Sequence, residues 1–313
     1  MVVLRGVLLA LTFVSGLAGA ALAETVLHRG NSKEPDSLDP HRAAGVWENE
    51  IIGDMFLGLT TEAANGDIVP GSAKSWTISD DGLVYTFTLR DNLYWSDGVQ
   101  VTASDFVFGM RRIMDPATAA RYASLLFPIK NAHAINTGKM NPDAIGVVAL
   151  DSKTVEITLE SPVPFFTQLL AHYTTYPIPQ HAFAVHGEDW VKAGNMVTNG
   201  AYVLQEWVTN SHVKVSKNPK FYDAANVAID TVFYYPIEDS RTGLKMFETG
   251  ELHTNLMTAG FPSTMLEDVT QRLPDEARVV PSLGNRFLPM NTSKPPFNDK
   301  RVRKAVSMLV DRE

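Results

Sequence analysis

Two stretches of alternating residues constrain the fold of this chain most strongly. Residues 147–159 and residues 201–216 each contain two runs of alternating apolar and polar residues around a short polar turn. This pattern is typical of an antiparallel hairpin that buries one face. Residues 85–89 alternate in the same way. The sequence therefore predicts several strands that each bury one face.

Helical patterns lie between and after these strands. Thr102 and Asp105 have the spacing of a capping box, and the apolar residues that follow fall on one helical face until Asp115 and Pro116. Residues 48–56 and 240–247 also fit helices. Because strands and helices do not alternate regularly, the predicted class is α+β.

A last helix is predicted to begin at Asn298 or Asp299. It carries a stripe of apolar residues at helical spacing, formed by Val302, Ala305, Val306, Leu309 and Val310. An apolar stripe needs a surface to cover it. Either the preceding domain or a further lobe could supply that surface.

The amino terminus has the features of a secretory signal peptide. Arg5 precedes an apolar run over residues 6–20, and residues 21–23 form an Ala-Leu-Ala cleavage site. We therefore assign residues 1–23 as a signal peptide and expect export to the periplasm. The alternative is an uncleaved anchor, but the apolar run is near the lower length limit for spanning a bilayer. Glu24 follows the cut, so no lipid anchor on a cysteine is expected.

Composition excludes several functions. The formal net charge of -8 makes nucleic acid and anionic membranes poor partners. The chain has no cysteine, which excludes disulfides, thiol catalysis and cysteine-ligated zinc. Burial of a core must then stabilise the protein, and a hydrophobic content of 45% is sufficient for that.

Motifs for catalysis and metal binding are missing or poorly placed. The sequence contains no HExxH, P-loop, G-x-S-x-G or G-x-G-x-x-G motif. His181 and His186 are spaced too far apart to share one helical face as metal ligands. Ser211 and Lys214 match S-x-x-K, but they lie in an alternating strand pattern. We therefore expect no metal, no cofactor and no enzymatic activity.

Aromatic residues gather in predicted loops and at element ends. Large aromatic side chains suit a binding cleft because they offer contact area with few rotors to freeze. For each of them, burial in a core is the alternative. The residues are Trp47, Trp95, Tyr122, Tyr173, Tyr176, Trp190, Tyr234 and Tyr235.

Short stretches along the chain after residue 23 match one protein family in order: residues 37–41, 45–48, 54–59, 70–73 with 76, 85–90, 95–98, 101–103, 105–107, 122–123, 198–202, 296–299 and 301–303. Together they resemble the family-5 bacterial solute-binding proteins, which include periplasmic oligopeptide-binding proteins of ABC importers. The resemblance implies a periplasmic-binding-protein-like fold of cluster C type, with two lobes around a cleft. It assigns residues 24–57 and 182–283 to lobe I, residues 58–181 to an inserted subdomain, and residues 284–313 to the start of a second lobe that is mostly absent.

The resemblance also implies ligand-binding positions. A capture region lies in the first lobe, one aromatic side chain contacts the ligand, and a strand at the lobe junction contributes further residues. These positions are Ala44, Gly45, Val46, Trp47, Tyr122, Ser282, Gly284 and Phe287. Ala44 stands where several oligopeptide binders have Glu, and Phe287 where they tend to have Tyr. The acid that holds a peptide's amino terminus in those proteins lies beyond residue 313.

The function implied is capture of a peptide and its delivery to ABC permease subunits and their ATPases. The ligand would pair through its backbone while the lobes close over it, with no chemical step, and the protein would act as a monomer. Other members of the family carry dipeptides, nickel, haem or glycosides, so these ligands remain open. A role outside transport, such as an adhesin or chaperone, and an inert truncated product are further alternatives.

Overall fold

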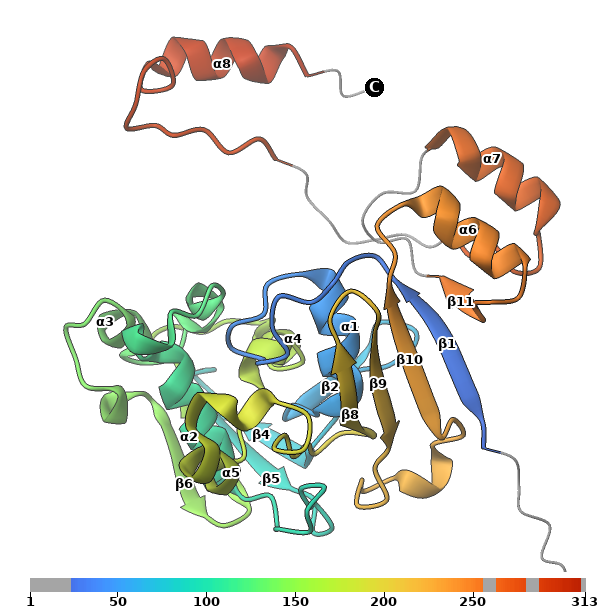
Figure 1. Cartoon of the computed structure of the whole chain (residues 1–313). Helices are drawn as coiled ribbons and strands as arrows, with labels where there is room; N and C mark the ends of the chain where they lie inside the picture. The colour runs from blue at the N-terminus through green and yellow to red at the C-terminus, as the bar shows by residue number, and fades with distance from the viewer. Residues whose placement is uncertain (1–23, 256–262, 280–286, 311–313) are drawn as a thin grey trace, which may run out of the picture. The chain divides into compact units, whose positions relative to one another are not determined.

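The computed structural model describes residues 24–255, 263–279 and 287–310. The chain divides into two compact units, Met1–Phe261 and Pro262–Glu313. The first contains three sheets and most of the helices (Figure 1). The described part of the second contains α7 (Ser263–Arg272) and α8 (Lys300–Met308). Sheets and helices occur together without regular alternation, as the predicted α+β class requires.

The largest sheet joins segments from both ends of the first unit. Its first strand runs parallel to two strands that come much later in the chain, and the remaining pairs are antiparallel. Figure 1 shows the first strand, in blue, beside the late strands in orange. In spatial order the strands are β11 (Thr254–Asn255), β1 (Val26–Asn31), β10 (Thr231–Pro236), β9 (His212–Lys217) and β8 (Tyr202–Val208).

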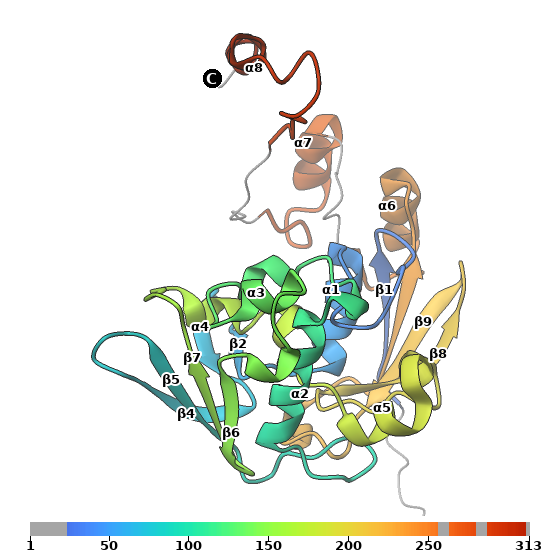
Figure 2. The same ribbon diagram turned by 90° about the vertical axis from the view of Figure 1, so that its left-hand side faces the viewer.

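The two faces of this sheet differ. One face buries Val213, Val232 and Tyr234. The helix α1 (Val46–Met55) packs on this side of the sheet, as both views show (Figures 1 and 2). The helix begins two residues before the predicted range 48–56. We call a group of side chains on the opposite side that are not buried the open sheet face. It consists of His28, Glu206, His212, Lys214, Phe233, Tyr235 and His253.

The second sheet is antiparallel throughout. Its order is β4 (Ala73–Ile78), β5 (Val84–Leu89), β7 (Thr154–Thr158) and β6 (Val147–Asp151). In β5 the predicted alternation is confirmed, since Tyr85, Phe87 and Leu89 are buried and their neighbours are not. The helix α2 (Ala103–Met114) packs on β6 and β7. It has the predicted capping box at Thr102 and ends at Asp115 as expected.

Shorter elements complete the described chain. Their bounds are β2 (Thr60–Glu62), β3 (Ile68–Pro70), α3 (Ala132–Asn136), α4 (Phe166–Leu169), α5 (Gln180–His186) and α6 (Ser240–Glu248), with short 3-10 helices at Pro116–Thr118, Ala123–Leu126, Pro142–Ala144, Tyr173–Thr175, Gly187–Val191 and Ala224–Asn226. Both predicted hairpins, β6 with β7 and β8 with β9, are confirmed.

One continuous core connects the two large sheets. At the junction the Asn199 amide accepts from the backbone N–H of Leu57 at 3.1 Å and donates to its carbonyl at 2.9 Å. Trp95 and Trp190 are fully buried there. Several aromatic residues considered for a cleft therefore belong to the core, namely Trp95, Tyr173, Tyr176, Trp190 and Tyr234.

The strands of the five-stranded sheet come from residues 24–57 and 182–283, and those of the four-stranded sheet from within residues 58–181. The division into lobe I, an inserted subdomain and the start of a second lobe stays a prediction. No helix in the described ranges combines the length and apolar character needed to cross a bilayer.

Candidate functional site

The predicted capture region lies where the chain enters α1. We call Ala44–Trp47 the capture segment. Gly45 is the N-cap residue and has an extended backbone, with φ -99° and ψ 157°. Glu48 lies one turn into the helix with only 1% of its surface exposed. Its carboxylate accepts from the backbone N–H of Asp36 at 2.9 Å, of Ala44 at 3.3 Å and of Gly45. One buried carboxylate therefore fixes the segment from the inside.

Two tyrosines fix the segment from the other side. Tyr173 donates to the carbonyl of Ala43 at 3.3 Å, and Tyr122 donates to the carbonyl of Ala44 at 3.2 Å. The ring of His172 lies 4.2 Å from that of Tyr173 and 5.6 Å from that of Tyr122. We call Tyr122, His172 and Tyr173 the aromatic group. Tyr122 is 37% exposed, so the aromatic group reaches the surface beside the capture segment.

Burial keeps His172 and Tyr173 of the aromatic group uncharged. Loss of hydration lowers the pKa of His172 to about 4, and the imidazole is neutral near pH 7. Burial also raises the pKa of Tyr173. A neutral aromatic surface suits apolar parts of a ligand and offers few hydrogen-bonding atoms.

Trp47 ends the capture segment with an unpaired donor. Its indole Nε1 is buried and has no hydrogen-bond partner among the described residues. Its carbonyl accepts from Asn31 at 3.1 Å, and the Lys33 ammonium lies 5.2 Å from the ring. A Cβ at Gly45 would lie 2.3 Å from the Trp47 ring, so only glycine fits there. The indole thus determines the residue at the N-cap.

A buried polar network lies just before the capture segment. Arg112 on α2 binds Asp39 through two hydrogen bonds of 3.0 and 2.6 Å, and it lies 3.0 Å from His41 Nδ1. The Asp39 carbonyl accepts from the backbone N–H groups of Arg42 and Ala43, which forms a turn. The network therefore links α2, which packs on the second sheet, to the turn that leads into the capture segment.

Burial and charge set the protonation of this network. Loss of hydration, together with the nearby Arg112 charge, lowers the pKa of His41 to about 3, although Asp39 opposes the shift. Burial alone would raise the pKa of Asp39, but hydrogen bonding to Arg112 and its charge outweigh burial and hold that pKa below its usual value. At neutral pH the network is a neutral imidazole beside a paired Arg and Asp.

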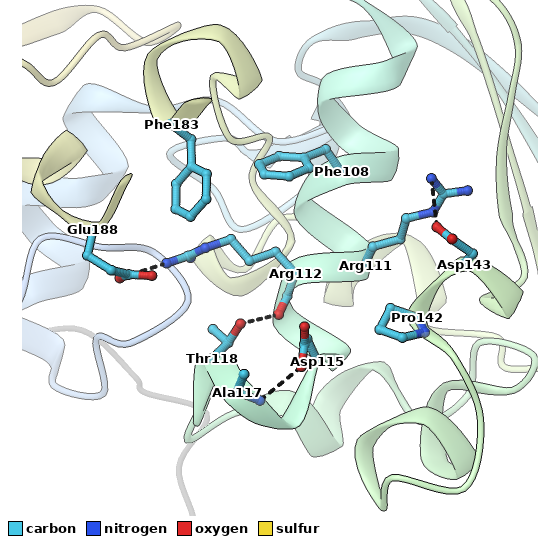
Figure 3. Close-up of a pocket in the computed structure, with 10 residues that line it drawn as sticks. All are labelled: Phe108, Arg111, Arg112, Asp115, Ala117, Thr118, Pro142, Asp143, Phe183 and Glu188. Carbon is cyan, nitrogen blue, oxygen red and sulfur yellow. Dashed lines mark hydrogen bonds and ion pairs between the residues drawn. The ribbon is translucent and has the colours of Figure 1, made fainter. Parts of the chain in front are cut away.

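A separate pocket of about 370 Å³ borders this network (Figure 3). Its charged groups already have partners: Arg111 pairs with Asp143 at 3.3 Å, and Arg112 lies 3.6 Å from Glu188. None of the predicted site residues lines it. The lining residues are Phe108, Arg111, Arg112, Asp115, Ala117, Thr118, Pro142, Asp143, Phe183 and Glu188. Among the described residues, no cluster of three or more His, Asp or Glu side chains is arranged to hold a metal ion.

A family model described as "Bacterial extracellular solute-binding proteins, family 5 Middle" matches residues 67–313. The chain belongs to this family. The resemblance noted from short sequence stretches is therefore confirmed. Members of this family are solute-binding proteins.

Family-5 proteins of known sequence match nearly the whole chain. The periplasmic oligopeptide-binding protein OppA of Escherichia coli is 40% identical over 299 residues, which is 95% of this chain and 54% of that protein. The probable deoxycholate-binding periplasmic protein YgiS of the same organism is 40% identical over 292 residues, which is 93% of this chain and 54% of that protein. The chain thus spans about half the length of these relatives.

Solved structures of the family share the fold. OppA of Burkholderia pseudomallei matches with a TM-score of 0.87 and 34% identity, covering 93% of this chain and 57% of that one. Haemophilus influenzae OppA in complex with RPPGFSPFR matches with a TM-score of 0.83 and 34% identity, covering 93% and 56%. The predicted two-lobe fold class, with only part of it present here, is confirmed.

The structure brings only some of the predicted site residues together. The capture segment is continuous, and Tyr122 reaches it through the bond to Ala44. Ser282 and Gly284 lie outside the described residues. Phe287 is in the second unit and is 81% exposed. The roles of all these residues in binding stay predictions.

Sequence reasoning missed the residues that hold the segment. Glu48 follows the N-cap at the capping-box position, which was the available signal. Tyr173 was noted only as one of several loop aromatics, and His172 was not noted. Asp39 and His41 belong to a matching stretch, but nothing in the sequence links them to Arg112, because that contact depends on the tertiary fold.

Proposed function

We propose that this chain supplies the first-lobe side of a peptide-binding cleft in a periplasmic solute-binding protein. The observation that carries the proposal is the chain just before α1, where Gly45 has an extended backbone and where Glu48, Tyr122 and Tyr173 hold residues 43–45 from three different parts of the chain. A ligand strand can pair with backbone groups only where that backbone is fixed in an extended conformation. Fixing it before binding also lowers the entropic cost of binding.

The wider role follows from the family. Relatives are named as periplasmic oligopeptide-binding proteins, and one solved structure holds a peptide. We infer that the protein acts in the periplasm as a monomer, binds a peptide without chemical turnover and delivers it to ABC permease subunits and their ATPases. Closure over the ligand would link binding to docking, because only the closed form presents both lobes to the permease.

A steroid-like amphipathic acid is the second candidate ligand. One relative with 40% identity is named as probably deoxycholate-binding. Ala44 and the neutral aromatic group give this side of the site an apolar character, which suits a fused-ring ligand as well as a peptide side chain.

Isothermal calorimetry separates these candidates. The chain Glu24–Glu313 and a chimera extended with the remaining part of Escherichia coli OppA are titrated with di- to pentapeptides and with deoxycholate. We expect the chimera to bind peptides. Tyr122→Ala in the chimera should weaken binding at least tenfold, which corresponds to about 1.4 kcal/mol.

Tyr94→Ala is the matched control, because Tyr94 is similarly exposed at 39% and lies outside the capture segment and the aromatic group. Equal losses in both variants would contradict the assigned role of Tyr122. Binding of deoxycholate without peptide would favour the second candidate. If the folded chimera binds neither ligand, the proposal is wrong.

A further inference from the structure

The last described strand of the first unit is attached to the sheet partly by a side chain. His253 donates its backbone N–H to the carbonyl of His28 at 2.8 Å. In return, the backbone N–H of His28 donates to the imidazole Nδ1 of His253 at 2.9 Å. In a parallel ladder a carbonyl oxygen usually accepts such a bond. Here a titratable ring takes the place of that carbonyl.

The strand that follows is short but closely fitted. β11 has two residues, and Asn255 pairs with Gly30 of β1. A Cβ at Gly30 would lie 2.2 Å from the Asn255 side chain, and a Cβ at Gly243 on α6 would lie 2.4 Å from it. The Asn255 amide therefore fills a space between β1 and α6. Such a short strand depends strongly on each bond that attaches it.

The two imidazoles at this position have different partners. The Nδ1 of His28 lies 2.8 Å from the hydroxyl of Tyr235, which can donate or accept. His28 can therefore bind a proton and keep this bond. The partner of His253 Nδ1 is a backbone N–H, which can only donate. A proton on that nitrogen would face another proton, and the bond would be lost.

Charges around the pair do not compensate for this loss. The two rings lie 5.4 Å apart, so two protonated imidazoles would also repel each other. In the described ranges no carboxylate forms an ion pair with either ring. The titratable and charged groups on the neighbouring elements are Tyr235 on β10, His212 and Lys214 on β9, Glu206 on β8, Arg241, Lys245 and Glu248 on α6, and Glu251 before β11. Glu206 is already paired with His212 and Lys214.

We propose that His253 is a pH-sensitive latch that releases β11 from β1 on acidification. The neutral ring completes the strand pairing, and the protonated ring cannot. Attachment is therefore complete near neutral pH and weakens as the pH falls. β11 is the last strand that the structure describes in the first unit. This inference does not depend on the identity of the ligand.

Hydrogen exchange of the full chain tests the latch. We expect the His28 amide to exchange slowly at about pH 7.5. After correction for intrinsic exchange, its protection should be lower at about pH 5 than at about pH 7.5. His253→Ala should show weak protection at every pH. His212→Ala, another histidine of the open sheet face, should follow the wild type.

Equal wild-type protection at both pH values would overturn the proposal, as would His253→Ala with the wild-type pH dependence. A second measurement on the unmodified protein does not rely on variants that fold. Nitrogen NMR of the imidazoles should show His253 at neutral pH with its proton on Nε2. A proton on Nδ1 would contradict the latch.

Discussion

The buried polar network and the open sheet face contain similar residue types in opposite surroundings. The side chains of Arg112 and Asp39 are 6% and 3% exposed. They bind each other and His41, and Arg112 also lies 3.6 Å from Glu188. On the open sheet face, Lys214 and Glu206 also pair, but their side chains are 31% and 50% exposed. Water can replace a lost partner at Lys214 or Glu206 but not in the network. Loss of one partner of an ion pair should therefore lower the free energy of unfolding much more in the network than on the open sheet face.

The largest expected difference comes from removing the cation of each pair. Arg112→Met leaves the Asp39 carboxylate buried without its partner and should lower the free energy of unfolding by about 3 to 5 kcal/mol. Lys214→Met, on the open sheet face, should change it by less than about 1 kcal/mol. Urea denaturation of both variants at pH 7 measures the two effects. Similar losses of unfolding free energy in the two variants would show that burial does not determine the cost of removing the cation.

Acid should affect the network through His41. Its folded pKa of about 3 lies below the ordinary value of 6.5, so the unfolded chain binds a proton that the folded chain does not. Its contribution is complete above pH 6.5 and is lost as the pH falls toward 3. Between pH 6.5 and pH 4 this loss is about 3 kcal/mol. Stability curves of the wild type and of His41→Asn across this range measure it.

His172 contributes to the same acid slope, because burial lowers its pKa to about 4 as well. His41→Asn should therefore reduce the slope without abolishing it. A variant with the full wild-type slope would mean that His41 binds protons equally in both states.

Local patterns were sufficient to predict much of the fold. The alternation in β5, the two hairpins and the capped helix α2 were all found from the sequence. The central strand β10 was not, because its run of Val232, Phe233, Tyr234 and Tyr235 does not alternate. Its parallel pairing with β1 joins distant parts of the chain, and no local pattern encodes such a contact.

The site was predictable only through resemblance. The family resemblance placed Ala44 and Tyr122 in the predicted site, and the structure adds the bond that joins them. Without the resemblance, Tyr122 was one of several loop aromatics that could suit a cleft, and Ala44 was not selected at all. The supporting contacts of Glu48, Tyr173 and Arg112 are tertiary, and each residue type is common in other roles.

A smaller difference is expected between the buried carboxylate of Glu48, beside the capture segment, and the exposed carboxylate of Glu206 on the open sheet face. Glu48→Gln replaces one oxygen that accepts backbone N–H groups with an amide that can only donate. It should lower the free energy of unfolding by about 1 to 3 kcal/mol. Glu206→Gln, at 50% exposure, should cost less than about 1 kcal/mol. Equal costs by urea denaturation would mean that the capture segment is held by other contacts.

The smallest effect concerns the two tyrosine hydroxyls. Tyr122→Phe loses the bond to the Ala44 carbonyl, and Tyr235→Phe loses the bond to His28. Water can reach both positions, so each change should cost only about 0.5 to 1 kcal/mol. The two variants should differ in ligand affinity instead. In the chimera, Tyr122→Phe should weaken peptide binding because it frees the capture segment, whereas Tyr235→Phe should leave affinity unchanged. Calorimetry that finds equal affinity in both would show that the Tyr122 hydroxyl does not position the segment for its ligand.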